Sequence, residues 1–555
     1  MQGKSGEEKV GVFVDHERCT VEKEVVFVDW KGKPEDAKKH GGRRAAAFVC
    51  AAEALENMVV VSNAANLVTY FYSSMNYSLA QSANMVTNFL GTSLMLSLLG
   101  GFICDSFLNR FWTIITFGII ELLGLSIMTI QAHFKQFHPP PHQRPSAAQA
   151  AMLYSGLYIM ALGIGGVKAA LPAHGGDQFP DRNKRLSNFF NWFFFSLCSG
   201  GLVAVTLIVW IQENKGWQWG FGVATGAIFL LLVVVSLGLP YYRHKIPSGS
   251  PFSRITKVLV CSIKNRNVTL PAHIPAIDRN SSPSLNTFIL LLELCHDIVL
   301  KSLLLELKKT DIFGTRFLDK ATLRDCTDDE VAETKIFLGL LPIFFSTIMM
   351  NCCLAQLSTF SIQQGHRMNT TLFHSFTIPT SSLTAIPLVF MLLSVSLYDR
   401  FFLKAAARHG LTPLKRIGLG LVLASVAMAV AAIVEVKRKA RLEAPISVLW
   451  LGWQYLLLGV SDMFTLAGMM EFFYSEAPES MRSVCTAGSW CSTASGFFLS
   501  SVLVTLANAL SSGLGSREWI AGTDLNNSRL ELFYTVLALL NFFNFLNYLF
   551  WARWY

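Results

Sequence analysis

Residues 217–240 read WQWGFGVATGAIFLLLVVVSLGLP and contain no ionisable side chain. A helix needs about 20 consecutive, mostly apolar residues to cross the hydrocarbon core of a bilayer, and this stretch is long enough. The segment is therefore predicted to be a membrane-spanning helix. The solvent for much of the chain would then be lipid rather than water.

The composition of the whole chain agrees with that prediction. Of its 555 residues, 52% are hydrophobic and only 15% are charged, whereas a soluble domain carries about a quarter charged residues. The formal net charge of +9 does not indicate nucleic-acid binding, because Lys and Arg lie in the connectors between apolar runs. Most of the 11 cysteines lie inside apolar runs without CxxC spacing, so neither a zinc site nor a disulfide framework is expected.

Further apolar runs lie on both sides of this stretch. Together they predict six spans in the first part of the chain, at residues 45–72, 78–99, 111–132, 149–172, 187–212 and 217–240. Six more are predicted after a long polar stretch, at residues 335–360, 375–397, 414–436, 445–473, 486–509 and 530–552. This is the plan of transporters in which two related bundles share a site at their interface.

The expected fold is an all-α integral membrane protein with twelve transmembrane helices in two six-helix bundles. Its expected divisions are a cytoplasmic N-terminal tail at 1–44, a bundle at 45–240, a cytoplasmic linker at 241–334, a bundle at 335–552 and a C-terminal tail at 553–555. Within the linker, residues 285–309 are rich in Leu but carry several charges, each of which would cost about 2.5–3.5 kcal/mol inside a span. An amphipathic helix on the cytoplasmic surface is therefore favoured over a thirteenth span.

The distribution of Lys and Arg orients the chain, because cytoplasmic connectors are enriched in these residues. With both termini in the cytoplasm, the basic residues of the inner connectors are Arg110, Arg182, Lys184, Arg185, Arg243, Lys245, Lys404, Arg408, Lys415, Arg416 and Arg482. One predicted outer loop runs against the pattern, with Lys437, Arg438, Lys439 and Arg441. The majority favours cytoplasmic termini.

Two acids lie inside the first predicted span. Glu53 and Glu56 are three residues apart, so they share one face of a helix. Two ionised carboxylates one turn apart repel each other, and at least one is expected to hold a proton. Ionisable residues in spans are rare and are often functional, which makes this pair a candidate for proton or substrate coupling. The alternative is a pair that only neutralises a cation or lies at the inner end of the span.

The fourth predicted span contains one cation. Its sequence GIGGVK at 163–168 places Lys168 near mid-membrane, where it needs an acid or an anionic ligand. The glycines permit close helix approach. The string is not a phosphate-binding loop, because no strand precedes it and no GK[ST] follows.

Three more acids lie in predicted spans. Glu471, in the tenth span, could face Lys168 across a cavity, or could lie near the inner interface and hold Arg482. Asp462, in the same span, is a weaker candidate for a cavity role. Glu121, in the third span, is equally well explained by snorkelling or by an inter-helix hydrogen bond.

Several short strings resemble known transporter signatures. The string GGFICDSFLNR at 100–110 resembles the loop signature of the major facilitator superfamily, in which Asp105 and Arg110 would clamp neighbouring helix ends. The other strings together resemble the plant nitrate/peptide transporter family, which belongs to the proton-coupled oligopeptide transporters. They are GGDQF at 175–179, FFNWFFFSLCSGGLVA at 189–204, FLDKA at 317–321, AQ at 355–356, YDR at 398–400, and EFFY at 471–474 followed by Met481 and Arg482.

The resemblance implies roles for individual residues. The first-span ExxE[R/K] motif of that family, tied to proton coupling, matches Glu53 and Glu56, with Asn57 in place of the basic residue. Its fourth-span lysine matches Lys168, which is left as the main counter-charge. Its tenth-span glutamate, which contacts the amino end of the substrate in peptide carriers, matches Glu471.

Within the family, residues 53–124 are most similar to the subfamily whose members carry abscisic acid and gibberellins. Leu354 stands where a member that carries nitrate has a histidine, and Asn57 replaces the cation that helps to hold a peptide carboxylate. A carboxylated, largely apolar hormone bound at Lys168 is therefore the expected substrate. The other expected substrate-binding residues are Asn57, Tyr70, Phe193, Gln356 and Glu471, and the expected gating or structural residues are Asp105, Arg110 and Arg482.

The expected function is therefore import of a small organic anion with protons by alternating access, across the plasma membrane. Nitrate or di/tripeptide transport within the same family remains an alternative, as does a receptor that binds the hormone without moving it. A membrane-embedded enzyme is disfavoured, because no histidine lies in mid-span and His174 falls just beyond the fourth span. The expected partners are the substrate, protons and the lipid bilayer, with no cofactor, metal or nucleic acid.

Overall fold

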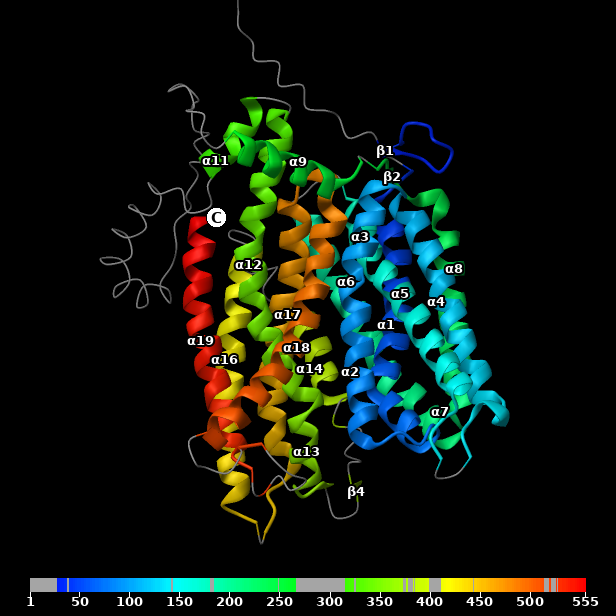
Figure 1. The fold of residues 1–555 in the computed structure, drawn as a ribbon, viewed down its shortest axis with the longest axis vertical. Helices are drawn as coiled ribbons and strands as arrows, with labels where there is room; N and C mark the ends of the chain where they lie inside the picture. The colour runs from blue at the N-terminus through cyan, green and yellow to red at the C-terminus, as the bar shows by residue number, and fades with distance from the viewer. Residues whose placement is uncertain are drawn as a thin grey trace, which may run out of the picture.

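Long helices in two groups make up the computed structural model (Figure 1). It describes residues 27–36, 39–140, 143–179, 184–247, 249–265, 315–323, 326–372, 376–377, 383, 385–398, 411–442, 444–513, 519–520, 526 and 528–555. Eleven of the helices in these ranges are long and apolar enough to cross a membrane. The shorter apolar helix α14 (Ala385–Leu397) stands at the eighth predicted span. The prediction of an all-α membrane protein in two bundles is confirmed.

The first bundle contains the six predicted spans of the first part of the chain. Each apolar run forms a helix because a backbone in lipid must satisfy its own hydrogen bonds. The helices are α1 (Gly42–Ser73), α2 (Leu79–Met95), α3 (Ser97–Ser106), α4 (Arg110–His133), α5 (Ala147–Gly176), α6 (Lys184–Val203), a π-helical turn (Ala204–Ile208), α7 (Val209–Asn214) and α8 (Trp217–Leu237).

The second bundle is built in the same way. Its helices are α12 (Asp328–Ser358), α13 (Phe360–His366), α14, α16 (Pro413–Lys439), α17 (Leu451–Glu476), α18 (Arg482–Gly513) and α19 (Leu530–Trp554). Between the bundles lie α9 (Pro251–Lys264) and α11 (Thr315–Asp319). The predicted amphipathic helix at 285–309 lies outside the described residues.

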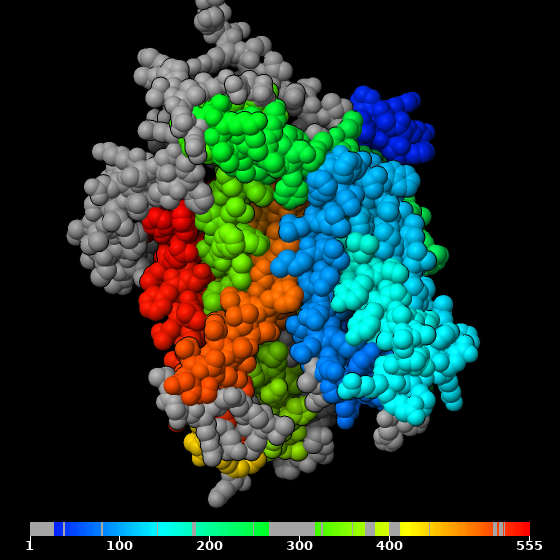
Figure 2. All heavy atoms as spheres, viewed as in Figure 1, coloured from blue at the N-terminus to red at the C-terminus, as the bar shows by residue number. Residues whose placement is uncertain are grey.

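The two ends of the molecule differ. One end, called the linker end here, carries α9, α11 and a two-stranded sheet of β1 (Phe27–Val28) and β2 (His244–Lys245) (Figure 1). The opposite or far end carries α7, α13 and the hairpin of β3 (Thr371–Leu372) and β4 (Phe376–Thr377). On the face seen in Figure 2, α18 of the second bundle lies against α2 and α3 near the linker end, and the helices diverge toward the far end.

The second predicted span is longer than expected and is broken once. The prediction ended it at residue 99 and placed a loop from Gly100, but α3 continues to Ser106 and the turn is confined to residues 107–109. Glycine is needed there for packing: a Cβ at Gly100 would lie 2.6 Å from the Cα of Gly166, and one at Gly101 would lie 2.9 Å from the carbonyl oxygen of Ser483. The pair therefore brings α3 into contact with both α5 and α18.

Two other helix ends also differ from the prediction. Helix α12 begins at Asp328 rather than near 335, because Thr327 and Glu330 form a reciprocal capping box. Helix α5 continues to Gly176, so His174 is a buried residue of its last turn rather than a loop residue.

Glycines bring α5 against its neighbours, as the GIGGVK string predicts. A Cβ at Gly163 would lie 2.5 Å from the Cα of Glu121 on α4, and one at Gly165 would lie 2.7 Å from the Cβ of Leu96. The prediction of close helix approach is confirmed. This packing is what places the side chain of Lys168 deep in the first bundle.

Candidate functional site

Helices α1 and α5 bring one cation and two acids together. The Nζ of Lys168 lies 2.9 Å from the Oε1 of Glu53, forms a second ion pair with Glu56, and donates to the Oδ1 of Asn57 at 3.2 Å. All four side chains are buried. The spacing of residues 53, 56 and 57 places all three on the face of α1 that meets α5.

The pairing around Lys168 is incomplete. Among the described residues, Glu53 Oε2 and Glu56 Oε1 have no hydrogen-bond partner although both atoms are buried. One ammonium group cannot neutralise two carboxylates, and a buried uncompensated charge is expensive. A proton on one of the two acids balances the charge, so the geometry suits a site that exchanges a proton.

A tryptophan from the second bundle covers the cation. The ring of Trp490, on α18, lies 4.5 Å from the Nζ of Lys168, and its Nε1 donates to the carbonyl oxygen of Lys168 at 3.1 Å. Sequence reasoning missed Trp490, because no local pattern relates residues 322 positions apart. The contact joins the charged cluster to the opposite bundle.

Glu471 does not face Lys168 as predicted. Its carboxylate lies 2.7 Å from the guanidinium of Arg416, on α16. The alternative partner, Arg482, lies instead 3.0 Å from Glu479. Both predicted partners of Glu471 are therefore wrong in this conformation.

Arg416 was assigned to an inner connector and is in fact buried in the first turn of α16. Pro413 starts that helix early, with Thr412 as its cap. The Arg416 guanidinium also donates to the Oδ1 of Asn191, on α6, at 2.7 Å. Arg416 therefore links the two bundles, and neither it nor Asn191 was identified as a site residue from the sequence.

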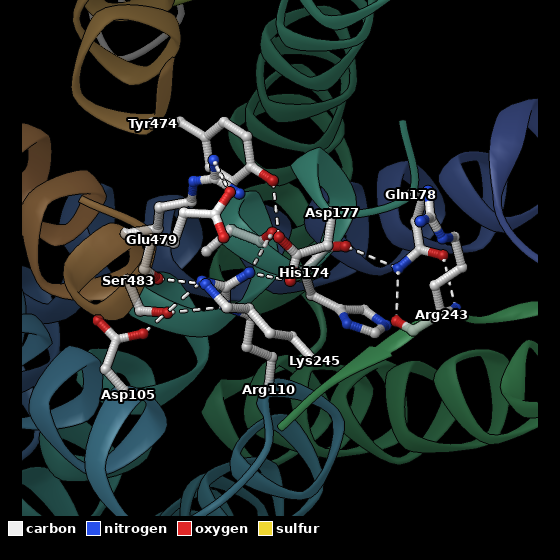
Figure 3. A network of polar contacts seen from close by, with 12 residues as sticks. Asp105, Arg110, His174, Asp177, Gln178, Arg243, Lys245, Tyr474, Glu479 and Ser483 are labelled. Carbon is white, nitrogen blue, oxygen red and sulfur yellow. Dashed lines mark hydrogen bonds and ion pairs between the residues drawn. The ribbon is translucent and has the colours of Figure 1, made fainter. Parts of the chain in front are cut away.

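A larger polar network joins the bundles at the linker end (Figure 3). Asp105 lies 3.6 Å from Arg110 and accepts the backbone N–H of Val484 at 3.0 Å. Arg110 donates to the Oγ of Ser483 at 2.9 Å and forms an ion pair with Asp177. Asp105 and Arg110 thus contact both the ends of the first-bundle helices and the start of α18.

Two further groups complete this network. The hydroxyl of Tyr474 on α17 donates to Asp177 at 2.6 Å, and the guanidinium of Arg482 lies 5.1 Å from the Tyr474 ring. Lys245, which follows the first bundle, donates to the carbonyl oxygen of Glu479. Burial, together with the nearby positive charges of Arg110 and Arg482, lowers the pKa of Lys245 to about 7.

Three predicted substrate-binding residues lie apart from Lys168. Tyr70 is buried in the first bundle between Trp217 and Phe221, with ring centroids 5.1 and 5.3 Å away. Phe193 packs on Phe189 at 5.7 Å. Gln356 donates to the Oγ of Ser500 at 2.9 Å, within the second bundle. Within the part of the chain that the structure describes, none of the three forms a hydrogen bond, ion pair or ring contact with the Lys168 cluster.

The comparisons with known proteins settle the family. The model of the family described as PTR2, POT family, matches residues 111–520. The chain belongs to the POT family. Its curated relatives include Protein NRT1/PTR FAMILY 4.2 of Arabidopsis thaliana, 51% identical over 95% of this chain and 98% of the relative. Protein NRT1/PTR FAMILY 4.1 of Arabidopsis thaliana is 48% identical over 96% of this chain and all of the relative.

Solved POT family structures share the fold. An auto-inhibited POT family peptide transporter matches with a TM-score of 0.63 at 21% identity, covering 92% of this chain and 97% of that one. A POT family transporter in complex with 5-aminolevulinic acid matches with a TM-score of 0.60 at 14% identity, covering 92% and 98%. The POT family chain described here is thus a multi-pass membrane protein of a transporter family.

Proposed function

We propose that this chain imports a small organic anion together with protons, with abscisic acid and gibberellins as the first substrates to test. The observation that carries the proposal is the buried Lys168, which is paired with Glu53 and Glu56, while Glu53 Oε2 and Glu56 Oε1 have no hydrogen-bond partner among the described residues. Such a cluster can exchange an anion and a proton at one place.

The coupling follows from charge balance. When a substrate carboxylate binds Lys168, it competes with Glu53 and Glu56 for the only ammonium group of the cluster. Acids that lose this counter-charge in a buried site bind protons more tightly. Anion binding and proton binding therefore favour each other, and by linkage each raises the affinity of the site for the other. Loss of the protons returns Lys168 to the acids and weakens its hold on the anion.

The contacts between the bundles support transport by alternating access. Three polar contacts that cross between the bundles lie at the linker end: Arg110 with Ser483, Tyr474 with Asp177, and Arg416 with Asn191. We place this end, with both termini, in the cytoplasm of a plasma-membrane protein, because Arg110, Arg243 and Arg482 lie there. Substrate would then enter from the far end and leave after the linker-end contacts break.

The choice of hormones rests on relatedness and on the charge of the site. The relatives named NRT1/PTR FAMILY 4.2 and 4.1 share about half of their residues with this chain, and residues 53–124 resemble the subfamily that carries abscisic acid and gibberellins. A substrate with a single carboxylate also matches a site with a single cation, because Lys168 provides the positive charge and Asn57 stands where the family motif has a second one.

Uptake of four labelled compounds tests the proposal. Oocytes expressing the chain would be given abscisic acid, a gibberellin, nitrate and a dipeptide at about pH 5.5 and about pH 7.5, on either side of the range where histidines and perturbed acids titrate. Hormone uptake above that of water-injected oocytes, and greater at the lower pH, supports the proposal. Uptake of only nitrate or dipeptide would replace the substrate, and saturable binding without accumulation would indicate a receptor.

A further inference from the structure

A third buried acid stands beside the Lys168 cluster. Glu121, on α4, is fully buried, and both of its carboxylate oxygens lack a hydrogen-bond partner among the described residues. Its backbone packs against Gly163 of α5, less than two turns before Lys168. Its carboxyl group interacts electrostatically with both Glu56 and Lys168.

No other cation in the described surroundings is placed to neutralise Glu121. Helix α8, which packs against α4, has no ionisable residue. On α3, which also packs against α4, Asp105 is engaged with Arg110. His244 and Lys245 of β2, and Lys135 just after α4, lie outside the membrane-spanning helices. His174, in the last turn of α5, packs against Tyr242 and His244 at the linker end. The charged groups that act on Glu121 among the described residues are therefore Lys168 and Glu56, and Glu53 shares the same ammonium group.

The charges of this group do not balance without protons. Glu53, Glu56 and Glu121 provide three carboxyl groups, and Lys168 provides one positive charge. A carboxylate buried without hydrogen bonds or a counter-ion is strongly disfavoured, so the neutral cluster contains two protonated acids. The position of Asn57, where the family motif has a cation, increases this requirement.

We propose that Glu121 is an additional proton-binding residue, which exchanges a proton during the transport cycle together with the Glu53–Glu56 pair. Glu121 receives a proton while Lys168 is engaged by the first-span acids. It releases the proton when Lys168 turns toward it, because the ammonium group then stabilises the carboxylate. This rests on the proposed function for the transported proton, but the binding of a proton by Glu121 is testable without any substrate.

Infrared spectroscopy tests the proton itself. Difference spectra of the purified, full-length protein between about pH 5.5 and about pH 8.5, a range that spans the titration of perturbed acids, report carboxyl groups that lose their protons. The Glu121→Gln variant should lack part of the protonated-carboxyl C=O signal of the wild type. Glu121→Asp should retain it, and the matched control Glu213→Gln, which removes an exposed acid of the same bundle, should be unchanged.

Accumulation in proteoliposomes tests the coupling. Each co-transported proton multiplies the equilibrium accumulation ratio about tenfold for a gradient of one pH unit. With tritiated abscisic acid as the probe, Glu121→Gln should accumulate about tenfold less than wild type, while Glu121→Asp and Glu213→Gln should match wild type.

The two measurements separate the two proposals. If wild type itself fails to accumulate the hormone, the proposed substrate or coupling is wrong, and the infrared comparison still decides whether Glu121 exchanges a proton. If Glu121→Gln is folded and gives the wild-type infrared difference, the inference is overturned. Wild-type accumulation by Glu121→Gln with a changed infrared spectrum would also overturn it, because the proton would then not be transported.

Discussion

Each bundle contains a buried charge cluster, and the two are paired to different extents. In the second bundle, Glu435 and Arg438 lie one turn apart on α16, and the guanidinium donates to both carboxylate oxygens at 2.7 and 2.8 Å. Gln364 donates to Glu435 at 2.7 Å, and Arg438 donates to Asn526 at 2.7 Å. One acid, one base and two amides leave a neutral group with its charges satisfied.

The cluster of the first bundle has an excess of acid. Lys168 is shared by Glu53 and Glu56, with Glu121 beside them, and several of the carboxylate oxygens have no hydrogen-bond partner in the described part of the chain. Both clusters are buried, so burial alone does not separate a structural ion pair from an exchange site. The difference lies in the balance of charges and hydrogen bonds: a satisfied pair resists change, whereas an unsatisfied cluster changes its protonation when a ligand arrives.

Removing one member of the satisfied pair should have the largest effect on stability. Glu435→Gln leaves the Arg438 charge buried without its partner, which costs about 3–5 kcal/mol of unfolding free energy. Thermal unfolding in detergent should show a large fall in Tm, while the pH dependence of uptake by the surviving protein stays as in wild type. The matched control is Glu531→Gln, which breaks a partly exposed pair with Lys439 and should cost less than about 1 kcal/mol. A loss of pH dependence in Glu435→Gln would contradict the distinction between the clusters.

Removing the cation of the unsatisfied cluster should abolish anion uptake. In Lys168→Ala the acids can protonate, so the protein should remain folded, but no positive charge is left for the substrate. Uptake of labelled hormone should fall about 100-fold or more, which corresponds to about 2.7 kcal/mol of transition-state stabilisation. Lys215→Ala, which removes an exposed lysine of the same bundle, is the control. Uptake retained within a few-fold would refute Lys168 as the anion site.

Changing one acid of the pair should sharpen the proton assignment. Glu56→Gln keeps the shape of the side chain but can no longer exchange a proton. The stimulation of uptake by a gradient of one pH unit should fall about tenfold, which is the effect of one proton. Uptake measured with the same pH on both sides of the membrane should change less. Uptake by Glu56→Gln with the pH response of wild type would remove this residue from the proton pathway.

The smallest effect is expected at Lys245 of the linker-end network. Its pKa of about 7, against an ordinary 10.5, means that the folded protein binds fewer protons than the unfolded chain between these values. The contribution of Lys245 to the unfolding free energy therefore rises with pH from about 7 upward and is lowest below 7. After solvent screening, we expect the total gain in unfolding free energy over this pH range to be less than about 1 kcal/mol. Denaturation of wild type and Lys245→Met across this range checks it; parallel curves would contradict the assignment.

Much of the fold could be predicted from the sequence, because lipid imposes a strict requirement on each span. An apolar run such as 217–240 must form a helix of a length set by the bilayer, and α8 occupies it. The ends were less predictable. Gly100 and Gly101 suggest a loop by composition, and only the contacts with Gly166 and Ser483 explain why they are helical.

The site could be predicted in part for the same reason. Lys168, Glu53 and Glu56 stand out because ionisable residues in spans are costly, and the structure places them together. The partner of Glu471 could not be predicted, since it depends on how deeply the first turn of α16 places Arg416. The role of Trp490 depends on the packing of α18 against α5, which no local pattern encodes.

Pairing between the two flanks of the first bundle has a consequence for biosynthesis. Phe27 and Val28, before α1, pair with Lys245 and His244, after α8, and Glu35 forms an ion pair with Arg243. The helices of the first bundle and both strands that pair across it have thus left the ribosome once residue 245 is exposed. Because translation adds about 5–20 residues per second, the 310 residues after position 245 take about 15–60 seconds to synthesise, and the first bundle has this time to assemble before the second is complete. Force-sensitive stalling sequences placed after this point should record a folding event that Glu35→Ala weakens. The pairing of β1 with β2 would then close the first bundle during synthesis, before the second bundle exists.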